Sequence, residues 1–339
     1  MTSVAVVVLN FNGEKLLDQF LPSVVKHSGD AEVIIVDNGS TDQSVSLVKN
    51  KFPTVTLLEF KKNHGYCGGY NLALAQLNHS VAVLLNSDVE VTKDWLGSPI
   101  KMLESNPDVV AVQPKILSYL EKDKFEYAGA AGGFLDVMGY PFCRGRVFQT
   151  VEKDEGQYDD SIPIFWASGA CLIIRREAYL KAGGLDEDFF AHMEEIDLCW
   201  RLNRSGYRIL SDGQSKVYHL GGGTLAVGSP RKTFFNFKNG LTILVKNLPP
   251  MDLVFKLPFR LVLDWVADLN FLLSGYGSSC LAVFKAHLYF IAGLSRDLGK
   301  RRKLTMGHKL LPGLVFEKMI VFAYFLQGRK RYSDIKNPK

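Results

Sequence analysis

Apolar runs alternate with helically periodic segments along the first quarter of the chain. Residues 4–9 (VAVVVL) and 81–85 (VAVLL) are continuous apolar runs, which are typical of strands buried on both faces of a parallel sheet. The predicted strands are 4–9, 32–36, 54–59 and 81–85, and the predicted helices between them are 14–27, 43–50 and 69–78. This alternation of strands and helices predicts a right-handed, parallel α/β sheet.

Polar side chains follow three of these predicted strands. Asn10 and Asn12 come after the first strand, Asp37 after the second, and Asn86 and Asp88 after the fourth. Ligands of parallel α/β sheets bind beyond the carboxyl ends of the strands. The sequence therefore predicts a ligand site built from these turns.

The pattern changes in the second half of the chain. Residues 107–165 predict shorter strands with a mobile loop near 152–161, residues 167–180 a strand that enters a helix, residues 194–206 a helix ending at Gly206, and residues 207–211 and 216–220 two short strands. Beyond about residue 240, amphipathic and aromatic-rich segments carry scattered basic residues. We therefore expect an α/β domain over residues 1–240 and a mostly helical region over residues 241–339.

Composition and charge narrow the class of protein. Apolar residues make up 47% of the 339 residues and charged residues 22%, so a sizeable buried core is expected. The net charge of +5 is not concentrated in any stretch before residue 300, so we expect no nucleic-acid partner. No stretch of 18 apolar residues is free of charge, and the chain is therefore not expected to cross a bilayer.

Cysteine usage indicates the compartment. The five cysteines are odd in number, and no two of them are closely spaced. This pattern argues against a disulfide framework or a zinc site and fits a reducing, cytoplasmic location. The first residues, MTSVAVVVLNFNG, lack the basic start of a signal peptide.

Three carboxylates crowd into the segment HMEEIDLCWRL, residues 192–202. On a helix, Glu194 and Asp197 would share a face at positions i and i+3, and Glu195 would point elsewhere. Like charges this close raise one another's pKa, which is one way to prepare a catalytic base. The alternative is an acidic first turn that the helix dipole favours.

Four other segments could bind ligands, and each has a structural alternative. Asp37 in VDNGSTD could accept hydrogen bonds from a ligand or could cap a helix. The glycine-rich segment 63–71 (NHGYCGGYN) could bring backbone close to an anion or form a tight helix entrance. Asp88 and His219 could ligate a divalent cation, and Arg231 could neutralise a phosphate; an Asp turn, a structural histidine and a solvated loop are the alternatives.

The order of these segments is more specific than any one of them. VVVLNFNG, VDNGSTD, NHGYCGGYN, LLNSDVEV, SGACLIIRREA, GGLDEDFF, HMEEIDLCWRL and YHLGGGT follow one another along the chain. The series resembles the family 2 glycosyltransferases, and more narrowly their rhamnosyltransferase-like branch in cell-surface polysaccharide assembly. The resemblance covers roughly residues 3–240 and implies a GT-A fold, an α/β domain that binds a nucleotide-sugar.

The resemblance also implies roles for individual residues. Asp37 matches the carboxylate that meets the nucleotide base, and His219 matches a position associated with the metal or diphosphate. Asp88 matches the last carboxylate of the family's metal-binding Asp-x-Asp motif, whose first position is Asn86 here. Glu195 matches the catalytic base, which is usually Asp. The expected catalytic residues are Glu195, Asp197 and Glu194; the expected nucleotide-sugar-binding residues are Asn10, Asn12, Asp37, Asn63, Gly65, Asn71, Asn86, Trp166, Gly169 and Arg231; and the expected ligands of Mg²⁺ or Mn²⁺ are Asp88 and His219.

The implied reaction is a single displacement that inverts the anomeric centre. The expected donor is a UDP-, dTDP- or GDP-sugar, and the expected acceptor is a hydroxyl of a glycan or a lipid-linked glycan. A catalytically silent scaffold subunit is the alternative, because the metal motif lacks its first carboxylate. A nicotinamide-dependent oxidoreductase is disfavoured, because no glycine fingerprint follows the first strand.

The C-terminal region leaves two interpretations open. Residues 251–266 and 269–294 mix large apolar side chains with basic ones, and basic clusters lie at 300–303 and 329–331. Such segments can lie on an anionic membrane at the inner face of the cell membrane. They can equally pack on the catalytic domain or form a dimer.

Overall fold

The computed structural model describes residues 2–221, 229–304 and 310–335. Its strands are β1 (Val4–Asn10), β2 (Glu32–Asp37), β3 (Thr56–Glu59), β4 (Val81–Leu85), β5 (Val89–Val91), β6 (Val109–Ser118), β7 (Gly133–Asp136), β8 (Pro141–Cys143), β9 (Arg146–Val147), β10 (Thr150–Val151), β11 (Ile162–Pro163), β12 (Cys171–Arg175), β13 (Arg208–His219) and β14 (Val315–Phe316). Its helices are α1 (Glu14–His27), α2 (Ser44–Lys51), α3 (Gly65–Gln76), α4 (Gly97–Ser105), α5 (Arg176–Lys181), η1 (Glu187–Phe189), α6 (Glu194–Arg204), α7 (Pro230–Asn247), α8 (Pro250–Leu273), α9 (Gly277–Lys303), α10 (Ile320–Phe325) and α11 (Tyr332–Ile335).

The main sheet has the order β11-β13-β6-β12-β4-β1-β2-β3, with β5 paired to β13. The strands β4, β1, β2 and β3 are parallel, as the sequence predicts. The sheet as a whole is mixed, because β12 runs antiparallel to both β4 and β6. A strand buried on both faces has the same apolar pattern in either direction, so the sequence does not encode this reversal.

The central strands separate two apolar layers. In β1, Ala5 and Val7 pack on one side with Tyr70 of α3, whereas Val6 and Val8 pack on the other side with Leu17 of α1. Successive strand residues point to opposite faces, and a β-branched run therefore fills both layers at once.

The looser middle of the chain forms a second, smaller sheet. Its order is β10-β9-β8-β7-β14, and β14 comes from the C-terminal region. The segments 207–211 and 216–220 belong to one continuous strand, β13, rather than to two. The register of β13 against β6 shifts between Asp212 and Lys216, and this irregularity interrupts the apolar pattern that a strand prediction relies on.

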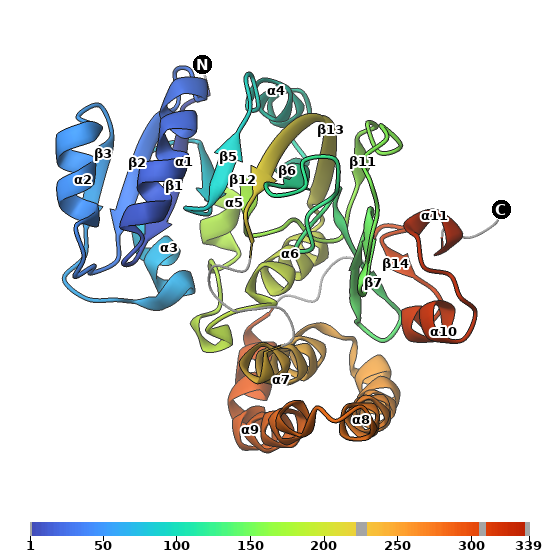
Figure 1. The fold of residues 1–339 in the computed structure, drawn as a ribbon. Coiled ribbons are helices and arrows are strands. Elements are labelled where there is room, and N and C mark those ends of the chain that lie inside the picture. Colours follow the sequence, from blue (N-terminus) through green and yellow to red (C-terminus); the bar gives the residue numbers. More distant parts are fainter. Residues whose placement is uncertain (1, 222–228, 305–309, 336–339) are drawn as a thin grey trace.

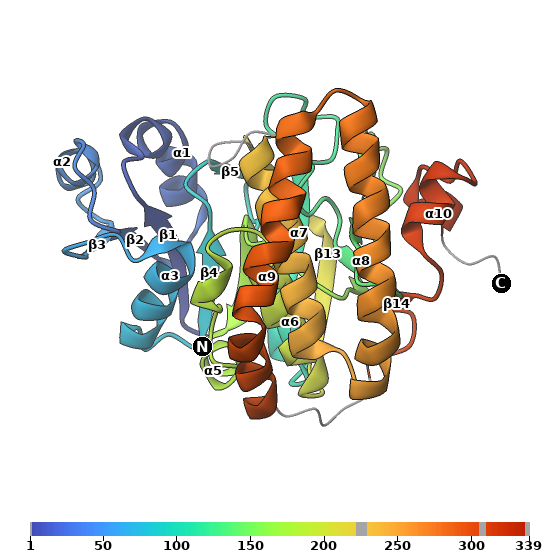
Figure 2. The same cartoon turned by 90° about the horizontal axis from the view of Figure 1, so that it is seen from below.

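The long helices α7, α8 and α9 form a layer below the main sheet (Figures 1 and 2). A helical C-terminal region is therefore confirmed, although residue 240 falls inside α7 and not between two elements. The last described segment returns to the small sheet, where Tyr332 packs on Phe134 with ring centroids 5.3 Å apart. Among the described helices, α9 alone is long and apolar enough to span a membrane by length and composition.

Candidate functional site

The turns after β1 and β2 are held together by polar side chains. Asn10 donates to Asp37 Oδ1 at 3.1 Å and to Ser40 Oγ at 3.1 Å. Asn12 has a positive φ of 52°, and its Oδ1 accepts from the backbone of Thr41 at 2.7 Å. Asn10 Oδ1 is buried and lacks a hydrogen-bond partner among the described residues. The predicted nucleotide-sugar-binding residues Asn10, Asn12 and Asp37 thus lie together in one hydrogen-bonded corner at the carboxyl edge of the sheet.

The glycine-rich segment extends this corner. Asn38 donates to Asn63 Oδ1 at 3.0 Å, and the same oxygen accepts from Gly65 N at 2.7 Å. Gly65 opens α3 with a φ of +73°, a conformation that other residues rarely adopt. A Cβ on Gly69 would lie 2.6 Å from Leu9 Cδ1, so a glycine at this position lets α3 approach β1. The amino end of α3 therefore lies beside the turn after β2.

Asp88 and His219 meet as the sequence predicts. His219 Nε2 lies 3.1 Å from Asp88 Oδ1, and Nδ1 of the same ring lies 3.6 Å from Glu126 Oε2. Asn86 Nδ2 is 3.5 Å from His219 Nε2. Burial lowers the pKa of His219, but hydrogen bonds to Asp88 and Glu126 and their charges outweigh it and raise the pKa to about 10. Asp88 before β5, His219 at the end of β13 and Glu126 after β6 thus lie close together.

The donor set fits a divalent cation that shares a diphosphate, with the cation displacing the proton that His219 Nε2 holds against Asp88. A carboxylate oxygen and an imidazole nitrogen converge, and a second carboxylate faces the other ring nitrogen, an arrangement that orients metal-bound histidines. Within residues 2–221, 229–304 and 310–335, no group of three or more His, Cys, Asp or Glu side chains is placed to hold a metal alone. Asp88 and His219 would therefore need the phosphate oxygens of the donor to complete a coordination shell.

The two adjacent glutamates lie at the start of α6, after a strained loop. Three residues before the helix, Phe190, His192 and Met193, have positive φ values of 64°, 64° and 76°. Asn239 of α7 holds this loop by donating to the carbonyls of residues 189, 191 and 192 at 3.1, 2.8 and 2.7 Å. Strain of this kind persists only where surrounding contacts fix it, and it is concentrated at functional sites.

Burial raises the pKa values of both glutamates. It raises the pKa of Glu195 to about 7, against backbone hydrogen bonds that lower it. Burial, followed by the charge of Glu195, raises the pKa of Glu194 well above the ordinary value. One carboxyl oxygen of each is buried without a hydrogen-bond partner in the described part of the chain. The coupled pair is thus Glu194 with Glu195, not Glu194 with Asp197.

Asp197 is held by structural partners, and its predicted catalytic role stays a prediction. Its side chain is fully buried, and it pairs with Arg201 at 2.9 Å and with Lys246 at 2.9 Å. Asn247 donates to the same carboxylate at 2.9 Å. These charges keep the pKa of Asp197 low despite the opposing effect of burial, which is the largest single cause. The contacts of the Asp197 carboxylate with Lys246 and Asn247 of α7 join α6 to the C-terminal helices.

Two of the predicted sugar-binding residues also have structural roles. Asn71 donates to the Leu185 carbonyl at 2.8 Å and accepts from Tyr179 at 2.6 Å. Trp166 is buried, and its indole N–H donates to the Phe134 carbonyl at 3.0 Å. Both side chains support the site from inside the domain, and neither has a polar atom to spare for a donor.

Gly169 and Arg231 remain candidates for donor contacts. The Gly169 carbonyl accepts from Tyr66 at 2.9 Å, and Tyr66 interacts electrostatically with both glutamates of α6. Arg231 in the first turn of α7 lies 5.4 Å from the ring centroid of Phe190. Arg231 therefore contacts the strained loop, and Gly169 is connected to the two glutamates through Tyr66. Residues 222–224 of the predicted motif VYHLGGGT lie outside the described residues.

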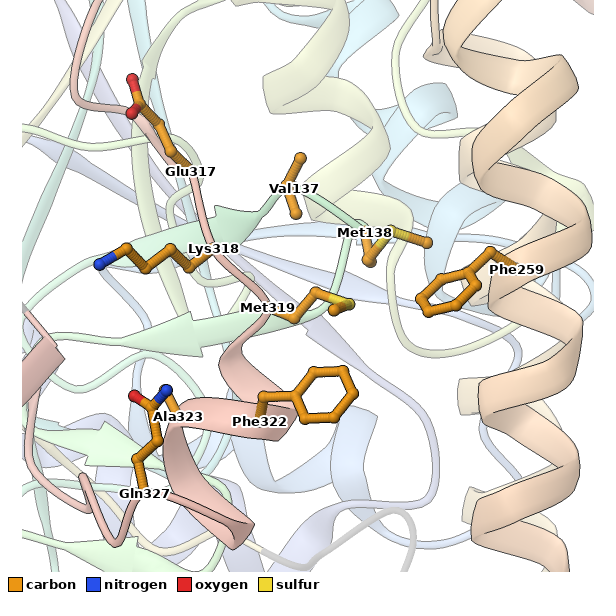
Figure 3. A pocket seen from close by; sticks show the side chains of 9 residues that line it. All are labelled: Val137, Met138, Phe259, Glu317, Lys318, Met319, Phe322, Ala323 and Gln327. Carbon is orange, nitrogen blue, oxygen red and sulfur yellow. The ribbon is translucent and has the colours of Figure 1, made fainter.

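Sequence reasoning did not single out three residues of this site. Glu126 lies far from His219 in the chain, Asn239 acts through backbone carbonyls, and Lys246 acts through a buried carboxylate. No local motif marks such long-range contacts. A cavity of about 520 Å³ lies elsewhere, between α8 and α10, and none of the predicted site residues lines it (Figure 3).

Comparison with known proteins shows the family to which the chain belongs. A sequence model described as Glycosyl transferase family 2 matches residues 5–182. The match spans more than half of the chain, from β1 to the residue after α5, and the chain belongs to this family. It is therefore a glycosyltransferase with a GT-A-like fold, as the resemblance of its motifs implies.

Two relatives are similar to the chain over most of its length. It is 28% identical over 233 residues to an N-acetylglucosaminyl-diphospho-decaprenol L-rhamnosyltransferase of Mycobacterium tuberculosis, covering 63% of this chain and 75% of that protein. It is 24% identical over 224 residues to the low-salt glycan biosynthesis hexosyltransferase Agl10 of Haloferax volcanii, covering 64% and 66%.

Solved structures show the same fold at lower identity. A mannosyltransferase of Pyrobaculum calidifontis in complex with GDP-Man and Mn²⁺ aligns with a TM-score of 0.53 and 17% identity, over 89% of this chain and 85% of that one. Residues 1–349 of S. aureus TarS in complex with UDP-GlcNAc align with a TM-score of 0.53 and 14% identity, over 89% and 92%. At these identities, the likeness shows the fold alone.

Proposed function

We propose that this chain is an inverting glycosyltransferase in which Glu195 is the general base. The sugar donor is a nucleoside diphosphate sugar, with rhamnose as the first candidate, and the acceptor is a hydroxyl of a lipid-linked glycan. The observation that carries the proposal is the Glu194–Glu195 pair, whose buried oxygens lack partners in the described structure and whose pKa values are raised. A base whose pKa lies near the working pH is best suited to general base catalysis.

The reaction follows from these positions. Glu195 takes the proton of the acceptor hydroxyl, the acceptor oxygen bonds to the anomeric carbon, and the bond from that carbon to the diphosphate breaks on the opposite face. Glu194, kept protonated by burial and by its neighbour, can donate a hydrogen bond within the site. A divalent cation at Asp88 and His219 would supply positive charge for the leaving diphosphate. Asn10, Asn12, Asp37 and Asn63 would orient the nucleoside.

The names of relatives support the finer parts of the proposal. The mycobacterial relative is named for transfer of L-rhamnose to a diphospho-decaprenol-linked sugar, which supports a lipid-linked acceptor here. The Pyrobaculum neighbour was solved with Mn²⁺, which supports Mn²⁺ or Mg²⁺ as the cation. We assign the activity to the cytoplasm and to residues 1–240, with residues 241–339 as a helical region that supports the site.

The proposal is tested by binding and turnover measurements on a panel of UDP-, dTDP- and GDP-sugars, with and without Mn²⁺ or Mg²⁺. Wild type should bind and hydrolyse one donor in a metal-dependent way, and Glu195→Gln should bind that donor but turn it over about 10³-fold more slowly. Glu104→Gln, an exposed change on α4, serves as the matched control. Failure to bind any donor would favour the catalytically silent scaffold instead.

A further inference from the structure

The outer sides of α8 and α9 are strongly apolar. Phe255, Val262 and Leu269 of α8 recur every seven residues and are 70%, 49% and 55% exposed. On α9, Leu281, Phe284 and Leu288 follow helical spacing and are more than half exposed. Side chains separated by three, four or seven residues share one face of a helix, so each helix presents an apolar stripe to solvent.

The two stripes lie on one layer of the molecule. Figures 1 and 2 show α8 and α9 side by side below the main sheet. With a rise of 1.5 Å per residue and a diameter of about 10 Å, two such helices cover on the order of 700 Å². Apolar stripes that occupy half or more of this footprint match the largest apolar patches of typical soluble monomers, about 300–600 Å², which are often functional.

Charge distinguishes this surface from an ordinary interior face. The exposed charged residues of α8 and α9 are the basic residues Lys285, Arg296, Arg302 and Lys303, and the 45% exposed side chain of Asp252 pairs with Lys256. The acidic residues of the two helices are buried or half-buried, and Asp264 and Asp297 pair with neighbouring side chains. An apolar face bordered mainly by exposed cations complements anionic lipid headgroups above an acyl layer.

Polar contacts keep α9 against the protein. His287 lies 3.4 Å from Asp264 of α8, and Thr242 of α7 donates to Asp297 at 3.1 Å. Lys300 at the end of α9 bonds to Asp186 and Asp188 beside η1. These buried partners fix α9 along the domain surface, which suits a helix lying in the plane of a membrane.

The apolar face continues into the cavity between α8 and α10. Phe259, on the exposed side of α8, lines this cavity together with Met138, Met319 and Phe322 (Figure 3). Methionine and phenylalanine side chains offer an adaptable apolar lining. The lining is apolar where it meets the exposed face, so the cavity could accept a hydrocarbon chain from a membrane that covers α8.

We propose that α8 and α9 form a docking surface for the anionic face of a lipid bilayer. The surface holds the domain against the membrane through apolar side chains that enter the headgroup layer and through the basic residues around them. Docking would bring a lipid-linked acceptor close to Glu195, and this role rests on the proposed function. The docking itself does not depend on the proposed function. Lys300 and Arg296 of α9 contact the loop before α6, so the docked helix lies next to the segment that carries the base.

The chain carries its own reporter for this interaction. Of its four tryptophans, Trp95, Trp166 and Trp200 are buried, whereas Trp265 on α8 is 62% exposed. We expect the full-length protein to co-sediment with phosphatidylcholine vesicles that contain phosphatidylglycerol and to show a blue shift of Trp265 emission. Pure phosphatidylcholine vesicles should bind it less, and high salt should weaken the binding.

Variants separate the apolar and the charged contributions. Phe255→Ser with Leu269→Ser should weaken vesicle binding by at least about tenfold, because two large side chains no longer leave water. Lys285→Glu with Lys303→Glu should weaken binding to the anionic vesicles by roughly tenfold or more. Leu120→Ser, an exposed apolar change in the segment after β6, is the control for the first pair of changes.

Three results would overturn the proposal. The first is that the wild type binds neither kind of vesicle. The second is that the double variant at Phe255 and Leu269 binds anionic vesicles as tightly as the wild type. The third is a wild-type dimer in light scattering that these changes convert to a monomer without vesicle binding, because a second copy would then cover the face. Donor hydrolysis without vesicles, together with circular dichroism, reports on the fold and the transferase separately.

Discussion

Glu195→Gln should stabilise the protein while it slows turnover about 10³-fold. In the fold, burial raises the pKa of Glu195 to about 7 from the ordinary 4.5. A carboxyl group with a raised pKa binds its proton more tightly in the folded state, so stability falls as pH rises from about 4.5 to 7. At pH 8 the ionised carboxylate costs about 3 kcal/mol, and at pH 5 the cost is about 1 kcal/mol.

Glutamine removes this cost because it is uncharged at every pH. With an unfolding entropy of about 2 cal/mol/K per residue, 3 kcal/mol corresponds to a rise in Tm of about 4 °C for a chain of this length. Thermal unfolding at pH 5 and pH 8, followed by calorimetry without donor or metal, measures the difference. Glu104→Gln, exposed on α4, should show no such dependence on pH.

The same titration should appear in the kinetics. Because the base acts as the carboxylate, kcat of the wild type should rise about tenfold per pH unit below about 7 and level off above it. A stability gain over the wild type that is the same at both pH values, or smaller at pH 8, would refute the argument that burial prepares the base. A pH-independent kcat would refute it as well.

Three further changes test the rest of the site. Asp197→Asn should destabilise the fold by about 3–5 kcal/mol in denaturant unfolding, because Arg201 and Lys246 lose their buried anion; unchanged stability with lost turnover would support a catalytic role. Asn239→Ala should lower kcat by about 10²-fold with little change in donor KM, since the loop before the base loses its three hydrogen bonds. Asp88→Asn, or chelation of the metal, should weaken donor binding in calorimetry, whereas equal binding with and without metal would argue against a cation there.

A matched control accompanies the change at Asn239. Thr242 lies one turn further along α7 and bonds to Asp297 of α9, not to the loop. Thr242→Val should therefore affect the packing of α7 on α9 but leave kcat near the wild-type value. Equal losses of kcat in both variants would show that α7 supports the enzyme only through general stability.

Much of the nucleotide half of the site follows from local sequence. The runs at 4–9 and 81–85 are strands, and the polar residues after them meet at one edge, because parallel strands end on the same side of a sheet. The pairing of Asp88 with His219 follows from the family motif order, and the structure brings the two within 3.1 Å. These features need only periodicity, turn chemistry and the sequence of motifs.

The acidic segment at 194–197 shows the limit of such reasoning. Helical spacing places Glu194 and Asp197 on related faces, but spacing does not say what packs against each face. Lys246 and Asn247, about fifty residues later, reach Asp197 and neutralise it. Glu194 and Glu195 receive no such partner within the described chain and remain the coupled pair.

The sequence by itself determined the strand and helix order of the first half, the polar turns at the sheet edge and the position of the acidic helix, because these depend on residues close together in the chain. The tertiary structure decided the direction of β12, the burial that raises the pKa of Glu195, and the joining of Glu126 to His219. It also decided that the apolar stripes of α8 and α9 face solvent and not the core. Burial and long-range pairing depend on which elements pack together in the fold. The apolar or charged pattern of one segment does not specify the segment that packs against it.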